Sequence, residues 1–203
     1  MKKAVLQEKY NVQGNELVEL GTVQAAQALL GWSIISTVDG VRCSGTIVET
    51  EAYCQYGDEA SHSRCGETER NRSMFLDAGH WYVYRSYGVH WCLNFVTADS
   101  GIGEAVLIRS IAPLEGLDTI IVRRKLTNQS ARGALNGPGK VCQALGISKN
   151  LDGESAFHRA GCQLWIEPPP PHLNASESKV IRATPRIGIT RSSDLPWRFL
   201  LEH

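Results

Sequence analysis

The segment Trp32–Tyr53 reads WSIISTVDGVRCSGTIVETEAY, and it contains two apolar stretches that meet at Asp39-Gly40. An Asp-Gly pair between two apolar stretches is a strong signal for a β-hairpin. A second hairpin is predicted over Trp81–Val96, WYVYRSYGVHWCLNFV, with its tip near Tyr87. Two such hairpins indicate a sheet whose strands are largely antiparallel.

Further elements are expected on either side of these hairpins. Thr22 predicts the N-cap of a helix over VQAAQALL that stops at Gly31, and GPGKVCQALGI predicts another helix after a glycine-rich entry. The sequence suggests strands at 104–110, 185–190 and 197–202, a polar helix within 114–136, a break at prolines 168–171 and poor order over 1–14. Strands and helices without regular βαβ alternation predict one α+β domain over residues 1–203.

Composition narrows the class of protein. The 203 residues are 42% hydrophobic and 21% charged, which is ordinary for a folded domain. No apolar run is long enough to span a membrane, and no apolar signal core follows the N-terminal MKK. We therefore expect a cytoplasmic protein (nuclear in a eukaryote) that is neither secreted nor membrane-bound. The net charge of zero argues against a large electrostatic clamp on DNA.

The six cysteines include no CxxC pair, so we expect reduced thiols rather than a disulfide frame. A zinc site formed by Cys54, Cys65 and His62 would have a spacing that fits no usual ligand pattern. No metal is therefore expected.

Ionisable and aromatic residues concentrate between Ile47 and Asn94. The alternation of a β-strand places Glu49, Glu51 and Tyr53 on one face. Two carboxylates at a strand end indicate either a general base that orients water or ordinary carboxylates paired with arginine.

The predicted loop over residues 54–73 adds His62 and three arginines, Arg64, Arg70 and Arg72. The histidine could hydrogen-bond a base or a phosphate, or be an ordinary solvated residue. The arginines could bind phosphate or hold the loop through carboxylates.

The second hairpin supplies more candidates. Tyr82 and Tyr84 share one face by alternation, and Tyr87 at the tip either inserts into a partner or packs onto the domain. Asn94 and Arg109 each close an apolar strand and need polar partners, which purely structural pairing would also supply.

Gly137–Lys140 reads GPGK but lacks the glycine at 134 and the Ser or Thr at 141 of a phosphate-binding loop. A helix N-terminus with an adjacent lysine remains, which is suited to a single phosphate of a DNA backbone.

The motifs IVETEAY, DEASHSR, RNRSMF, YVYRSYG, AVLIRS and GPGKVCQALGI follow one another in this order. Together they resemble the alkyladenine-type 3-methyladenine DNA glycosylases, from about Ala25 to Phe199. The resemblance implies one compact domain with a curved sheet and a protruding hairpin. It also implies a monomer that flips alkylated or deaminated purines out of duplex DNA and hydrolyses the N-glycosidic bond without metal or cofactor.

The resemblance further implies the roles of individual residues. Glu51 would activate water, and Arg109 would hold Glu51. Tyr53, His62 and Tyr84 would stack on the flipped base, and Asn94 would exclude normal guanine by meeting its exocyclic amine. The implied DNA contacts are Tyr87 as a minor-groove wedge, with Arg64, Arg72, Gly139 and Lys140 near the backbone phosphates.

One position departs from the family pattern. Glu69 stands where a proline is usual before Arg70-Asn71, so it adds negative charge beside the DNA and bears on affinity rather than on chemistry.

Other classes of protein compete with a glycosylase. A lesion-binding module that flips bases without cleaving them is the alternative, and the presence of Glu51 favours an enzyme. An RNA-base or nucleoside hydrolase would have no use for Tyr87 at an exposed tip, and a zinc deaminase would need an HxE…PCxxC signature. No lysine is placed to act as a Schiff-base nucleophile, so we expect no strand-cleaving lyase step.

Overall fold

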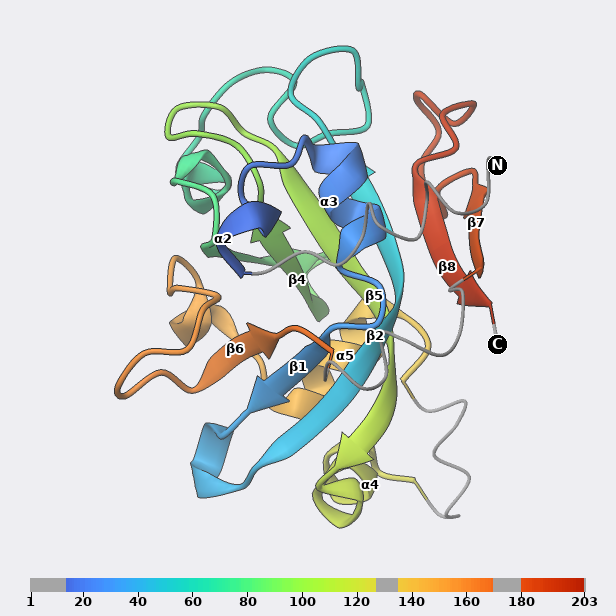
Figure 1. The fold of residues 1–203 in the computed structure, drawn as a ribbon. Coiled ribbons are helices and arrows are strands. Elements are labelled where there is room, and N and C mark those ends of the chain that lie inside the picture. The colour runs from blue at the N-terminus through green and yellow to red at the C-terminus, as the bar shows by residue number, and fades with distance from the viewer. Residues whose placement is uncertain (1–13, 127–134, 170–179, 203) are drawn as a thin grey trace.

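The computed structural model of the protein is organised around strand β2 (Cys43–Tyr53). β2 pairs antiparallel with β5 (Ala105–Glu115) along nearly its whole length. Its other edge pairs first with β1 (Ser33–Ser36) and then with β8 (Arg198–Glu202). Figure 1 shows β2 and β5 as long curved strands through the middle of the molecule, with β7 and β8 at one side.

The remaining strands complete one eight-stranded sheet in which every pair of named strands is antiparallel. This confirms the predicted α+β class with a largely antiparallel sheet. The strands are β3 (Trp81–Ser86) and β4 (His90–Val96), which form a hairpin beside β5, then β6 (Leu164–Glu167) beside β1, and β7 (Val180–Thr184) beside β8. The structure describes residues 14–126, 135–169 and 180–202.

The described helices are short, and α3 and α5 pack most extensively on the sheet. None of the helices within the described residues is long and apolar enough to cross a membrane. The helices are α2 (Gly14–Leu17), α3 (Thr22–Ala28), α4 (Leu117–Arg124) and α5 (Pro138–Leu145), with 3-10 turns at Val38–Gly40, Arg72–Phe75 and Lys149–Leu151.

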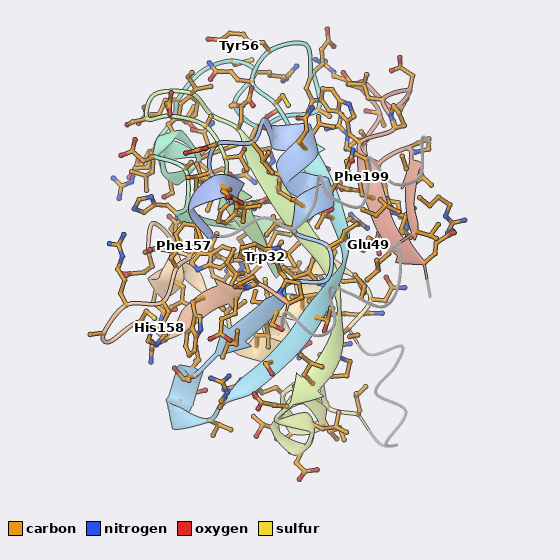
Figure 2. All side chains as sticks on the ribbon, viewed as in Figure 1. Trp32, Glu49, Tyr56, Phe157, His158 and Phe199 are labelled. Carbon is orange, nitrogen blue, oxygen red and sulfur yellow. The ribbon has the colours of Figure 1, made fainter. Side chains whose placement is uncertain are left out.

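The main core lies between these helices and one face of the sheet. Helix α3 contributes small residues such as Ala25 and Ala26, and the Thr50 hydroxyl of β2 donates to the Ala26 carbonyl at 2.6 Å. Trp32, which is 1% exposed, lies in the middle of the molecule in Figure 2. The opposite face of the sheet carries buried polar side chains such as Glu49 and Glu51 beside a smaller apolar cluster that includes Tyr82, Val96 and Ala105.

The alternation of β5 separates these two faces. Val106 and Ile108 join the main core, whereas Leu107 and Arg109 line a cavity. The pairing of β2 with β5 shifts register on both sides of Glu49, and Arg109 is skipped between its neighbours. Such bulges re-aim side chains and are common beside functional sites.

Three local predictions were wrong. The N-cap of α3 is Gly21, because the hydroxyl of Thr22 instead contacts Thr97 and Glu104 on the sheet side. Residues 185–190 form an irregular segment rather than a strand, and the strand lies just before it at β7. Asn94 and Arg109 lie within β4 and β5 rather than at their ends.

Two other predictions fall partly on residues outside the described part of the chain. Poor order was expected over residues 1–14, but Gly14 begins α2 and residues 1–13 are not described. Of the helical pattern at 114–136, the structure describes α4, while residues 127–134 lie outside.

Asp152 accepts a backbone hydrogen bond at the outer edge of the β3–β4 hairpin. One of its carboxylate oxygens accepts the Val83 amide at 2.7 Å, and the other accepts the Ser73 hydroxyl and the Lys149 ammonium. The outer amide of an edge strand is otherwise unpaired, so this carboxylate anchors the hairpin to the 3-10 turns on either side.

We expect Asp152→Ala to lower the free energy of unfolding by about 1–3 kcal/mol, because the buried Val83 amide loses its acceptor. Lys149→Met is the matched control, because it removes only the exposed ion-pair partner and should cost less than about 1 kcal/mol. Urea denaturation of both variants measures the difference, and equal losses would show that Asp152 acts only through Lys149.

Candidate functional site

A cavity of about 800 Å³ opens on the polar face of the sheet, within the size range of small-molecule sites. Strands β2, β4 and β5 form its base. The β3–β4 hairpin, the loop after β2 and the irregular segment 185–190 surround it. The residues that contribute side chains or backbone to it include Tyr53, His62, Arg70, Tyr82, Tyr84, Arg85, Tyr87, Cys92, Asn94, Leu107, Arg109, Pro138, Ile187 and Gly188.

Glu51 lies directly behind this cavity and is fully buried. Its Oε2 accepts the Tyr53 hydroxyl at 2.9 Å and Arg109 Nη1 at 3.1 Å, and its Oε1 accepts the Ile187 amide at 2.8 Å. All three donors belong to residues that line the cavity, although Glu51 itself does not. The Glu51 carboxylate therefore acts as an acceptor in all three hydrogen bonds.

Glu49 forms the second half of the same charge network. Its Oε1 accepts Arg109 Nε at 2.9 Å and Arg198 Nε at 2.6 Å. Burial opposes the charge of Arg109, but Glu51 and Glu49 more than compensate and raise the pKa of its guanidinium. Figure 2 shows Glu49 on the side of β2 that faces β8. The expected shared face of Glu49, Glu51 and Tyr53 is thus confirmed.

The aromatic side of the cavity comes mainly from the hairpin. Tyr82 and Tyr84 stack with ring centroids 5.4 Å apart, which confirms that they share a face. The ring of His62 meets the ring of Tyr84 edge-on at 4.5 Å, and its Nδ1 lies 3.0 Å from the Tyr82 hydroxyl. Burial raises the pKa of Tyr53, Tyr82 and Tyr84 above the ordinary value, so these phenols stay protonated and neutral.

His62 is exposed to solvent, but its imidazole contacts the rings of Tyr82 and Tyr84. Desolvation lowers the pKa of His62, and the nearby positive charge of Arg70 lowers it further. The imidazole is therefore neutral at neutral pH and can both donate and accept a hydrogen bond.

An NMR titration should give His62 an imidazole pKa below about 6.5, the usual value. The unfolded chain binds this proton more readily, so His62 should lower stability as the pH falls from about 6.5 to its folded pKa. Arg70→Gln should raise the pKa of His62, and Arg64→Gln, in the same loop, is the control. An unchanged His62 titration in Arg70→Gln would contradict the assignment.

Asn94 and Tyr87 occupy opposite ends of the site. Asn94 is 4% exposed at the base of the cavity, and its Nδ2 donates to the Tyr82 carbonyl at 3.0 Å. Tyr87 sits at the hairpin tip with a left-handed backbone (φ 49°), and it is 92% exposed. Such exposure excludes the interpretation that Tyr87 packs onto the domain.

The four residues expected to contact phosphates lie outside the main cavity. Gly139 and Lys140 lie in the first turn of α5, next to Pro138 at the cavity. Arg64 is exposed and lines an adjoining cavity of about 430 Å³ formed with residues 188–191. Arg72 is exposed in its 3-10 turn and lines neither cavity.

Several cavity residues were missed by sequence reasoning. The pairing of Tyr82 with Tyr84 was visible as alternation, but Arg85, Cys92 and Ile187 had no distinguishing signal. Ile187 acts through its backbone amide, which leaves no trace in residue type. Within the described part of the chain, Cys54, Cys65 and His62 do not gather into a group that could hold a metal ion.

Comparison with known proteins identifies the family of the chain. Residues 16–203 match the family model described as methylpurine-DNA glycosylase. The chain belongs to the methylpurine-DNA glycosylase family.

Relatives in this family match over most of their length. A protein of Nitrosospira multiformis named "Putative 3-methyladenine DNA glycosylase" is 46% identical, over 88% of this chain and 84% of its own. Proteins of the same name from Methanoculleus marisnigri and Chlorobaculum parvum are 46% and 42% identical, each over 91% of this chain and over 92% and 85% of their own.

Proposed function

We propose that the protein is a monofunctional purine DNA glycosylase of base excision repair. It flips an alkylated or deaminated purine out of duplex DNA into the cavity and hydrolyses the N-glycosidic bond, leaving an abasic site. The relatives' names and the family support the glycosylase class. The substrate is damaged duplex DNA, and the protein acts as a monomer without a cofactor.

The buried Glu51 is the observation that carries this proposal. The described residues supply three donors to a carboxylate that has about four lone-pair positions, so one position on Oε1 is left for a water. That water would enter between Arg109 and Ile187, which separate Glu51 from the cavity. Cleavage gives a sugar with oxocarbenium character, and the anion both orients the water and stabilises this charge.

The cavity's rings suit a purine. Tyr53, His62 and Tyr84 would stack on the flipped base, and base–aromatic stacking tolerates many base structures. A neutral His62 can hydrogen-bond the base edge, and Asn94 at the base of the cavity would meet the exocyclic amine of a normal guanine. Cationic alkylpurines leave readily, whereas hypoxanthine needs a proton from His62 or a water.

The contacts to DNA follow from the rim of the cavity. Tyr87 would occupy the space that the flipped nucleotide leaves in the stack. Lys140 and the Gly139 amide at the start of α5 would contact one phosphate, and the exposed Arg64 and Arg72 would contact others. Hydrolysis without a lyase step completes the proposed reaction.

Single-turnover excision from a duplex that bears hypoxanthine or ethenoadenine tests the proposal. We expect the wild-type protein to release the base and Glu51→Gln to slow release by at least about a hundredfold, because the amide cannot accept a proton from water. Binding of the lesion duplex by Glu51→Gln should remain.

Glu49→Gln is the matched control, since Glu49 contacts the same arginine from the next position on that face. Its effect on the rate should be much smaller. A larger loss in Glu49→Gln than in Glu51→Gln would assign the base to Glu49, and tight lesion binding without release by the wild type would favour a lesion-binding module.

A further inference from the structure

A second buried ion pair lies behind the cavity and has no part in the reaction described so far. Arg186 Nη1 and Nη2 donate to the two carboxylate oxygens of Asp58 at 2.6 and 2.7 Å, and both side chains are fully buried. The same guanidinium donates to the Ala52 carbonyl of β2 at 2.8 Å. This bidentate geometry fixes the plane of the guanidinium.

The guanidinium of Arg186 lies over the ring of Tyr53. Its central carbon is 4.6 Å from the centroid of the Tyr53 ring and 5.4 Å from that of Trp197. Tyr53 lines the cavity, whereas Arg186 and Trp197 do not. A positive charge therefore stands directly behind one of the rings expected to stack on the base.

Arg186 also anchors the segment that reaches Glu51. The next residue, Ile187, lines the cavity and donates its amide to Glu51 Oε1. The buried guanidinium of Arg186 thus fixes both the Ile187 amide, through the backbone, and the Tyr53 ring, through direct contact.

Resting on the glycosylase function above, we propose that Arg186, held by Asp58, is a positioning and specificity-determining residue. It fixes Tyr53 and the Ile187 amide, and its charge reduces the pocket's preference for positively charged purines over neutral ones.

The physical reason lies in the charge distribution of an aromatic ring. The face of a tyrosine ring is negative and attracts cations. A guanidinium on the rear face draws electron density away from the face turned to the base and also repels a cationic base directly. Asp58 partly balances that charge, so the two residues together set how strongly the pocket discriminates by charge.

Two variants should shift this discrimination in opposite directions. Asp58→Asn leaves the charge of Arg186 less balanced and should lower the ratio of cationic to neutral base excision. Asp58→Asn/Arg186→Gln removes both charges, keeps hydrogen-bonding groups in place, and should raise the ratio. Shifts of roughly threefold are expected, because only part of the cation–π effect of Arg186 is transmitted through the ring to the base.

The measurement compares single-turnover release of 3-methyladenine from methylated duplex DNA with release of hypoxanthine from an inosine-containing duplex. Trp197→Leu is the control, since it loosens the stack but keeps the cation behind Tyr53, and its ratio should match the wild type. Opposite shifts in the two Asp58 variants support the proposal. If the double variant does not fold, the direction in which Asp58→Asn changes the ratio of cationic to neutral base excision tests the proposal by itself.

Loss of both activities by the same factor in every variant would overturn the proposal and leave the pair a purely structural one. An unchanged or increased ratio in Asp58→Asn would overturn it as well. Absence of any base release by the wild type would instead count against the glycosylase function itself.

Discussion

The structure depends on the need to pair two carboxylates buried on the central strand. Glu49 and Glu51 project from the same face of β2, and both are almost inaccessible to solvent. Removing one partner from a buried ion pair costs several kcal/mol, so the cations must be brought to them. Arg109 of β5 contacts both carboxylates, and Arg198 of β8 contacts Glu49.

This pairing links the fold to the site. The arginines come from the two strands that flank β2, so the network holds both edges of the central strand in register. Arg109 follows the alternation of β5 onto the cavity face, where the register shifts beside it place its guanidinium against both carboxylates. With Asp58 and Arg186, three anions face three cations behind the cavity, and the charges balance.

The features that could be predicted from the sequence are those that depend on local rules, such as which side chains share a strand face. Alternation along β2 and β3 placed Glu49, Glu51 and Tyr53 on one face and Tyr82 with Tyr84 on another. The tip at Tyr87 followed from turn chemistry.

The sequence could not foretell contacts made across long separations or by the backbone. Asp58 and Arg186 are 128 residues apart, and an ordinary loop aspartate gives no sign of a buried partner. The stretch 185–190 has the apolar composition of a strand, but the Ile187 amide is used on Glu51 and Gly188 turns the chain with a φ of 76°. The Thr22 hydroxyl likewise serves a tertiary contact in place of the cap that its position suggested.

Product analysis tests the central claim, that water and not a protein side chain displaces the base in this cavity. The wild-type protein would be incubated with a duplex containing one hypoxanthine, with and without borohydride. We expect free hypoxanthine, an abasic strand that stays intact until alkali is added, and no protein–DNA adduct with borohydride. A borohydride-trapped adduct or a cleaved strand before alkali treatment would contradict the account.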